Sequence, residues 1–242
     1  MNSTGSSGPL HLALFPKGMG GEVMQVIRDV WYDDAFIDLK LENRITALLC
    51  QKLIDAFERD GHPWIVIPEL PLHDPEYGTE LGRNDLSIMH RACSQRDYFT
   101  VECKRLHVRK NGRFSSLAAD YVTEGLIRFA TGKYGEGRLH GGMIGYVLDA
   151  DMKLALKRID EQIAKRASDL RMAEGVKVSP PSSVLPNECY SFDTVHFLDT
   201  EQFTVFHLLL CDLQLYLKRV AAKSRGSDIL RRSAGNNRDP NE

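Results

Sequence analysis

The chain has 242 residues, enough for one ample hydrophobic core, and its 43% hydrophobic and 26% charged residues are ordinary for a folded globular protein. The formal net charge of −2 excludes a uniformly basic surface, so any surface that binds nucleic acid must be local. No apolar run approaches the ~20 residues of a membrane span, and the first residues lack the pattern of a signal peptide. We therefore expect no membrane association.

The five cysteines are widely spaced, odd in number and without a C-x-x-C pair. This pattern is typical of reduced, mostly buried thiols and does not indicate zinc or redox chemistry. With no membrane signal, it predicts a cytoplasmic protein. We expect a flexible lead over residues 1–21, a single domain over residues 22–217 and a polar, Arg-rich, disordered tail over residues 218–242.

The N-terminal part of the domain predicts two helices. Apolar residues recur at helical spacing between Val23 and Trp31, after a Gly-Gly pair, and predict a helix that ends near Tyr32. A second apolar face runs from Ile45 to Phe57. Glu42 lies one helical turn before Ile45, hence on the inward face, and the positive end of the helix dipole also favours a glutamate there.

The next segment predicts a short buried strand, Trp64–Pro68, rich in β-branched residues. We interpret residues 69–83 as a Pro- and Gly-rich connection. Its carboxylates are more simply solvated than functional, although each could approach a nearby site: Glu69, Asp74, Glu76 and Glu80.

Two runs rich in β-formers, Leu86–Met89 and Tyr98–Leu106, flank a polar segment and predict an antiparallel hairpin. With a turn centred near residues 94–95, Asp85 lies beside Glu102 and Lys104. Because side chains alternate along a strand, Glu102 and Lys104 share one face, and the opposite face is apolar. Two carboxylates and an ammonium group therefore gather on one side of a hairpin whose other side packs into a core.

Two carboxylates beside an ammonium group are suited to binding a hard divalent cation. Magnesium prefers a few carboxylate oxygens and several retained waters, and a neighbouring lysine can favour the hydroxide form of an attacking water. Asn84-Asp85 followed by Glu102-Cys103-Lys104 resembles the PD-(D/E)xK signature of the restriction-endonuclease-like nucleases. The pattern departs from the signature at Asn84, where the family name carries proline. Glu-x-Lys triplets are also common on solvated strands, and that simpler reading stays open.

The resemblance implies a role for each matching residue. Asp85 and Glu102 would hold the metal, the Cys103 carbonyl could add a ligand, and Lys104 would act at the attacking water. Magnesium would be the cofactor, with manganese as a possible substitute. Many nucleases of this class also place a glutamate on the first core helix near the metal, and Glu42 is the residue that matches.

A basic run follows the motif and passes through an Asn-Gly turn: Arg105, His107, Arg109, Lys110 and Arg113. Beside two carboxylates, cations are what a phosphate backbone would contact, so we interpret Arg105, Arg109, Lys110 and Arg113 as a candidate nucleic-acid surface. A solvated charged loop is the alternative reading.

The remaining chain predicts a helix over residues 116–131, a strand over 143–148, a charged amphipathic helix over 151–172, a proline-rich loop over 176–186 and strands over 190–197 and 203–210. The glycine-rich loop at 132–142 lacks the Gly-Lys-Ser/Thr ending of a P-loop. Tyr121 and Arg128 lie on the first of these helices, and either could support the site, but a packed tyrosine and a surface arginine are the simpler interpretations. We interpret His196 and His207 as packed strand histidines.

The element order from Glu42 to Leu148 matches the α-β-β-β-α-β core of the restriction-endonuclease-like fold, so we expect an α/β protein with a mixed sheet flanked by helices and additional C-terminal strands. The segments GGMIGYVLD and TVFHLLLCD faintly resemble uncharacterised proteins encoded with bacterial restriction and anti-phage systems. The resemblance implies a magnesium-dependent endonuclease that acts on DNA, with homodimerisation or other defence subunits as partners. A catalytically inactive DNA-binding or scaffold subunit of a larger, ATPase-containing complex is the alternative.

Overall fold

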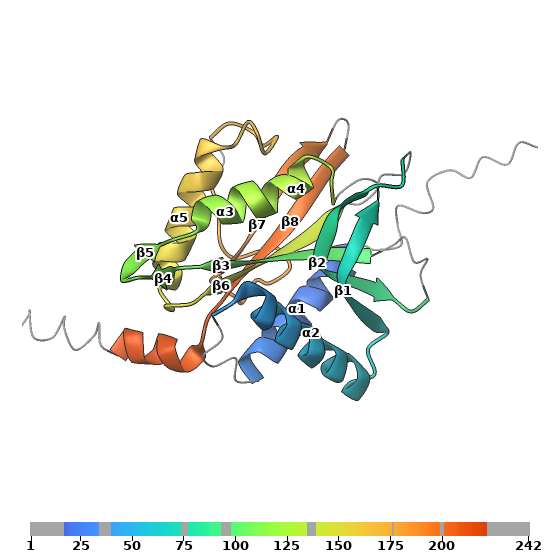
Figure 1. Ribbon diagram of the computed structural model, residues 1–242, viewed down its shortest axis with the longest axis horizontal. Coiled ribbons are helices and arrows are strands. Elements are labelled where there is room, and N and C mark those ends of the chain that lie inside the picture. The colour runs from blue at the N-terminus through green and yellow to red at the C-terminus, as the bar shows by residue number, and fades with distance from the viewer. Residues whose placement is uncertain are drawn as a thin grey trace, which may run out of the picture.

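The computed structural model describes residues 17–33, 40–73, 77–92, 98–134, 139–175, 177–198 and 201–221. At its centre lies a mixed six-stranded sheet in the order β1-β2-β3-β6-β8-β7, with helices on both faces (Figure 1). This arrangement confirms the predicted α/β class. The strands are Trp64–His73 (β1), Glu80–His90 (β2), Tyr98–Leu106 (β3), His140–Val147 (β6), Ser191–Leu198 (β7) and Glu201–Leu210 (β8).

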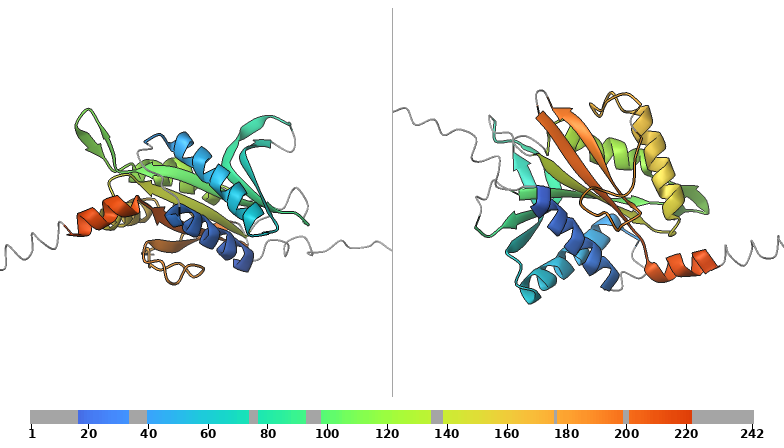
Figure 2. Two further views of the ribbon diagram at one scale, coloured as in Figure 1. Left: turned by 90° about the horizontal axis from the view of Figure 1, so that it is seen from below. Right: turned by 180° about the vertical axis from the view of Figure 1, so that it is seen from behind.

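Helices pack on both faces of the sheet, and each helix group covers its own hydrophobic core. The first core lies under Lys17–Asp33 (α1) and Glu42–Arg59 (α2), which pack together in both views of Figure 2. The second lies under Met152–Lys165 (α5) and a crossover helix built of Ala118–Asp120 (α3), the π-helical segment Tyr121–Leu126 (η2) and Ile127–Ala130 (α4). From α2 to β6 the main-sheet order is helix, three strands, helix and strand, as predicted.

Strands β1, β2 and β3 form an antiparallel meander, and β3, β6 and β8 run parallel. In the β2–β3 pair Leu86 lies opposite Val101 and Met89 opposite Tyr98. One further step in this register brings Asp85 level with Glu102, so the predicted hairpin is confirmed. Residues 93–97, where we expected the turn, lie outside the described residues.

Residues 69–83 were wrongly predicted to be a connection throughout. Strand β1 continues to His73 and β2 begins at Glu80, with Leu70 paired to Asn84. Pro68 and Pro71 are compatible with a strand here because β1 is at the edge of the sheet, where a missing N–H breaks no ladder on the open side. Of the carboxylates in this segment, Asp74 and Glu76 lie outside the described residues.

Helix α1 begins at Lys17, so residues 17–21, which we had assigned to the flexible lead, are helical. The Gly20–Gly21 pair does not break the helix. A Cβ atom on Gly20 would lie 3.1 Å from a ring carbon of Phe99, and one on Gly21 would lie 2.9 Å from Cβ of Val184. Glycine therefore permits close packing of α1 against its neighbours, and that packing offsets the low helix propensity.

The amphipathic helix α5 ends at Lys165, seven residues before the predicted end at Met172. The chain then turns to meet β7: the Leu170 carbonyl lies 2.7 Å from Nδ1 of His196, and the Arg171 carbonyl accepts the Phe197 N–H. These contacts to a distant strand compete with continuation of the helix. Sequence periodicity does not detect them.

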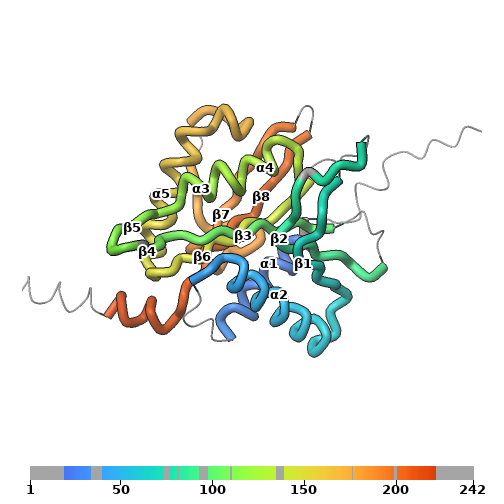
Figure 3. Tube along the Cα trace, viewed as in Figure 1, coloured from blue at the N-terminus to red at the C-terminus, as the bar shows by residue number. Residues whose placement is uncertain are grey.

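The basic run forms a small hairpin, Val108–Lys110 (β4) and Arg113–Ser115 (β5), that extends beyond the end of the main sheet (Figure 3). Asn111 and Gly112 both have positive φ values, as a tight hairpin turn requires, which confirms the predicted Asn-Gly turn. Toward the C-terminal part of the chain, residues 213–221 are helical, so the predicted disordered tail does not begin at 218. Residues 222–242 lie outside the described residues.

Candidate active site

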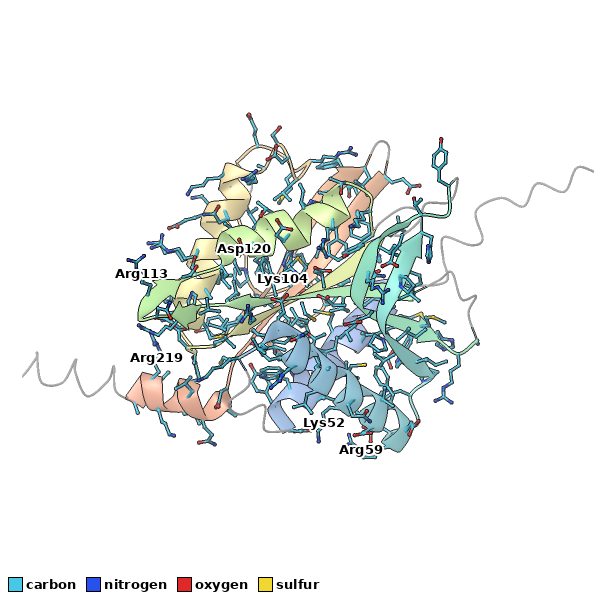
Figure 4. The ribbon with its side chains drawn as sticks, in the orientation of Figure 1. Lys52, Arg59, Lys104, Arg113, Asp120 and Arg219 are labelled. Carbon is cyan, nitrogen blue, oxygen red and sulfur yellow. The ribbon has the colours of Figure 1, made fainter. Side chains whose placement is uncertain are left out.

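Glu102 is the centre of the candidate site. Its side chain is fully buried in the middle of the sheet, and one oxygen, Oε1, accepts from two cations. Lys104 Nζ lies 2.6 Å from this oxygen and Arg128 Nη1 lies 2.7 Å from it. The Glu102–Lys104 pair confirms that these two side chains share a face, as strand alternation predicted. Figure 4 shows Lys104 near the centre of the sheet.

Arg128, for which a surface position was the simpler prediction, contacts the central carboxylate of the site. It comes from α4 and also donates to the Tyr134 hydroxyl at 2.7 Å, which in turn donates to the Arg83 carbonyl at 3.0 Å. Burial raises the pKa of Tyr134 and the charge of Glu102 raises it further, so this hydroxyl keeps its proton. Periodicity alone places Arg128 on the outer part of a helix. The close approach of that helix to the sheet is a tertiary feature.

The helix approaches the sheet closely at Gly125, in the π-helical segment. A Cβ atom there would lie 2.6 Å from Cε of Met143 and 3.7 Å from Cγ of Glu102. One-turn π-helical insertions are frequent at functional sites because they redirect the side chains that follow. The insertion directly precedes Ile127–Ala130, the short helix that carries Arg128.

Asp85 is the second carboxylate. Its Oδ2 accepts the backbone N–H of Cys103 at 2.6 Å, which ties the start of the hairpin to the motif strand. Burial raises the pKa of Asp85 to about 7, and the charge of Glu102 adds to this, while Lys104 acts in the opposite direction. The charge of Glu102 therefore disfavours ionisation of Asp85, and the two carboxylates lie close together, as the sequence predicted.

Lys104 connects the carboxylates. Besides Glu102, its ammonium group lies 3.2 Å from the Cys103 carbonyl and 3.5 Å from Oε1 of Glu42. Burial alone would lower the pKa of Lys104, but the charges of Glu102 and Asp85 raise it above its ordinary value. The side chain therefore stays charged at neutral pH. It can stabilise developing negative charge but cannot act as a neutral base.

Glu42 begins α2 and faces the site. Its Oε2 accepts the backbone N–H of Arg105 at 2.8 Å, and its Oε1 is the oxygen near Lys104. A cavity of about 200 Å³ adjoins this residue and is lined by Glu42, Asn43, Thr46, Ala47, Pro68, Glu69 and Asp85. The cavity gives small molecules a route to the Asp85 carboxylate. Glu69, expected only as a solvated residue, contributes a third carboxylate to its wall.

The donor set partly fits a hard divalent cation. Oε2 of Glu102 is buried and has no hydrogen-bond partner among the described residues, which is costly for a carboxylate oxygen unless a cation or water reaches it. The Asp85 carboxylate lies on the neighbouring strand, where the register brings it level with Glu102, and the Cys103 carbonyl directly follows Glu102 in the chain. Within the described ranges, however, no three or more His, Cys, Asp or Glu side chains form a group arranged to hold a metal. A cation would thus have two nearby carboxylates and a carbonyl, with water completing its shell.

Asn84, which stands where the signature has proline, connects the two strands. Its Nδ2 donates to Oγ of Ser87 at 3.0 Å and lies 3.4 Å from Oγ1 of Thr100. All three side chains are buried. Asn84 therefore supplies a buried polar contact between β2 and β3.

The four basic residues of the candidate nucleic-acid surface are not gathered at one place. The guanidinium group of Arg105 donates to the Lys40 carbonyl at 2.7 Å, close to α2. Arg109 lies over the ring of Phe114 in the small hairpin, and Arg113 lies on that hairpin, away from Lys104 (Figure 4). The side chain of Lys110 lies outside the described residues. A nucleic acid that contacted all of these residues would have to reach from the carboxylate site to the hairpin.

Other predictions concern residues outside the site. His196 and His207 are buried and bonded to Thr194, and His207 also to the packed Tyr121, which confirms them as packed histidines. Of the cysteines described, Cys50, Cys103 and Cys211 are buried and Cys189 is exposed, and all four are unbridged. Among the described residues, no helix combines the length and apolar character that crossing a bilayer requires.

No protein-family model, curated protein or solved structure matches this chain.

Proposed function

We propose that this protein is a metal-dependent phosphodiesterase of the PD-(D/E)xK type that cleaves DNA. The observation that carries the proposal is the convergence of Asp85, Glu102 and Lys104 on one side of the β2–β3 hairpin, with a buried, unpartnered carboxylate oxygen among them. The motif residues are far apart in the sequence from Glu42, Arg128 and Tyr134. Their assembly around one buried glutamate favours a functional role over a solvated strand.

In this proposal a magnesium ion, held by Asp85, Glu102 and the Cys103 carbonyl, would polarise the scissile phosphate and lower the pKa of an attacking water. The residues of the chain have separate tasks. Lys104 stays charged and stabilises negative charge at the attacking or transferred oxygen. Arg128 holds the Glu102 carboxylate in place, and Tyr134 fixes Arg128. Glu42 orients Lys104 from the side of α2.

The surroundings of the site favour an elongated polyanion over a small substrate. The cavity beside Asp85 is small, and the basic hairpin at Arg109 and Arg113 lies at some distance from it. Cations along a path contact successive phosphates of a nucleic acid and give affinity without sequence choice. Target choice would then come from a partner, such as a second copy or another subunit of a defence complex.

A second candidate function rests on the ion pairs of Glu102. Lys104 and Arg128 already compensate this carboxylate without a metal, an arrangement that suits a catalytically inactive scaffold or DNA-binding subunit. The two candidates differ in what divalent cations do. An active site binds Mn²⁺ or Mg²⁺ at the carboxylates and cuts plasmid DNA, whereas a scaffold does neither.

The experiment that separates them measures plasmid cleavage by purified protein in Mg²⁺, in Mn²⁺ and in a chelator. Wild-type protein and the Asp85→Asn variant are compared. We expect cation-dependent nicking or linearisation by the wild-type protein and none by the variant. If both proteins are inactive in both cations, the scaffold function is favoured. Equal cleavage by the two proteins would point to a contaminating nuclease.

A further inference from the structure

A second cavity, of about 370 Å³, shares no lining residue with the one beside Asp85. It lies at the carboxyl ends of the parallel strands β3, β6 and β8, and α1 and the start of α2 complete its wall. Its size suits a small organic molecule, and crevices at the carboxyl ends of parallel strands are where α/β folds commonly bind ligands. The phosphodiesterase proposal gives this cavity no role.

A buried histidine lines the cavity. Nδ1 of His107 lies 2.7 Å from Oδ1 of Asp149, and the same oxygen accepts the backbone N–H of Asp151. Because a carboxylate only accepts, Nδ1 carries the proton. The other ring nitrogen, Nε2, is buried without a partner among the described residues. His107 also has a φ of 58°, which is uncommon for a residue with a side chain, and its N–H donates to the Ser116 carbonyl.

Arg105 supplies a second unused nitrogen. Its Nη1 donates to the Lys40 carbonyl, which holds the guanidinium group, and its backbone N–H donates to Glu42, which holds the main chain. Its Nε is buried and has no partner among the described residues. A guanidinium group is permanently charged, and its Nε–H edge commonly grips carboxylate or phosphate oxygens. Arg105 therefore has a charged donor for which the described residues offer no acceptor.

The rest of the wall is largely apolar. Trp31 and Tyr146 stack on each other with ring centroids 5.3 Å apart, and Leu210 and Leu215 add aliphatic surface. Lys40 and Arg109 contribute further positive charge, while Asp149 is engaged by His107 and Asp212 remains as the other acid of the lining. Positive charge thus exceeds uncompensated negative charge next to an apolar wall.

We propose that this cavity binds a small organic anion, whose carboxylate or phosphate oxygens accept from Arg105 Nε and His107 Nε2 and whose apolar body lies against Trp31 and Tyr146. An imidazole protonated on both ring nitrogens donates from Nε2 as well as from Nδ1. Both unpartnered nitrogens are then satisfied by one ligand. The inference stands on the contacts of the cavity alone and does not depend on nuclease activity.

Trp31 allows a direct test because the chain has only one other tryptophan, Trp64. In a Trp64→Phe background, fluorescence reports on the cavity wall alone. We would titrate phenyl phosphate, benzoate and the neutral benzyl alcohol at matched ionic strength. We expect a saturable change in Trp31 fluorescence with at least one of the two anions. The anion that binds more tightly shows whether the cavity prefers a carboxylate or a phosphate. If neither anion changes the signal, or if the alcohol binds as tightly as both, the proposal is wrong.

Two variants of Arg105 make the test specific, each first checked for folding by circular dichroism. Arg105→Gln removes the charge, and Arg105→Lys keeps the charge but loses the Nε–H edge. We expect either variant to weaken anion binding by about tenfold or more, since hydrogen bonds to charged groups have about that effect. Arg158→Gln, in an exposed ion pair on α5 and outside the cavity lining, serves as the matched control and should leave binding unchanged. Unchanged affinity in both Arg105 variants would overturn the assignment.

Discussion

Arg128 Nη1 lies 2.7 Å from Oε1 of Glu102, the oxygen that also accepts from Lys104. A cation from the crossover helix therefore shares the central carboxylate of the motif with the lysine. Both cations approach one oxygen, while Oε2 is left without a partner among the described residues. The pairing suggests that Arg128 compensates Glu102 when no metal is bound.

This role for Arg128 predicts an interaction between the arginine and the metal. Arg128→Gln should lower the melting temperature in a chelator, because the buried Glu102 then has a single cation partner. Added Mg²⁺ or Mn²⁺ should raise the melting temperature of the variant more than that of the wild-type protein, since the metal takes over compensation of the charge. Thermal unfolding with and without cation measures both effects.

Arg158→Gln, in an exposed ion pair on α5, is the control and should respond like the wild-type protein. An identical cation response in wild type and Arg128→Gln would argue against a metal at Glu102.

The Glu102→Gln variant should lose cleavage and also stability. Its amide cannot compensate Lys104 and Arg128, so a buried ion cluster is left with excess positive charge, at a cost of roughly 3 kcal/mol in the free energy of unfolding. Urea unfolding measures the cost, and a plasmid assay measures activity. Glu161→Gln removes an exposed carboxylate instead and should change neither. Cleavage at the wild-type rate by a folded Glu102→Gln protein would exclude Glu102 as a metal ligand.

The raised pKa of Asp85 predicts an unusual dependence of the free energy of unfolding on pH. Its pKa of about 7 in the folded protein exceeds the ordinary value of 3.8. Between these values the folded state holds a proton that the unfolded state has released, so the free energy of unfolding falls as pH rises from about 4 to about 7. The slope approaches about 1.4 kcal/mol per pH unit. Asp85→Asn should remove this component, and unfolding measured across that range with both proteins tests it. Equal slopes for the two proteins would contradict the raised pKa.

The basic hairpin should support affinity more than chemistry. Neutralising Arg109, Lys110 and Arg113 together should weaken DNA binding and flatten its salt dependence, because each phosphate contact contributes a log-log slope of roughly −0.9. Fluorescence anisotropy with a labelled duplex at several salt concentrations provides the slope. The control variant neutralises three exposed basic residues of α5 instead: Lys153, Lys157 and Arg158. It has the same net charge as the hairpin variant and should keep the wild-type slope. If the hairpin variant keeps it too, these residues are simply solvated.

Local patterns predicted the hairpin and its site because the relevant information lies within one short stretch. Strand alternation placed Glu102 with Lys104, and the turn expected near residues 94–95 placed Asp85 beside them. The contribution of Arg128 was not predictable in this way, because it depends on a π-helical insertion and on a glycine that lets the helix approach. The end of α5 and the start of α1 were missed for the same reason. Distant contacts decided where each helix stops or begins.

A second source of error was that residues adjacent in the sequence belong to different sites. Arg105 follows the motif directly, so sequence proximity suggested a phosphate contact shared with the hairpin. Alternation along the strand instead directs it away from Lys104, toward Lys40 and the second cavity. One step along a strand thus separates a residue of the carboxylate site from a residue of a different pocket.

The most direct test of the central claim is single-turnover DNA cleavage by the wild-type protein and Lys104→Ala, with the melting temperature of each measured in the same buffer. If Lys104 stabilises charge during phosphodiester hydrolysis, the variant should bind Mn²⁺ but cleave at least ~10²-fold more slowly than the wild-type protein, the usual effect of removing a donor that stabilises developing negative charge. If the lysine only compensates Glu102 and Asp85, the variant will melt at a lower temperature and the wild-type protein will not cut DNA in Mg²⁺ or Mn²⁺. That second result would contradict the assignment of this protein as a nuclease.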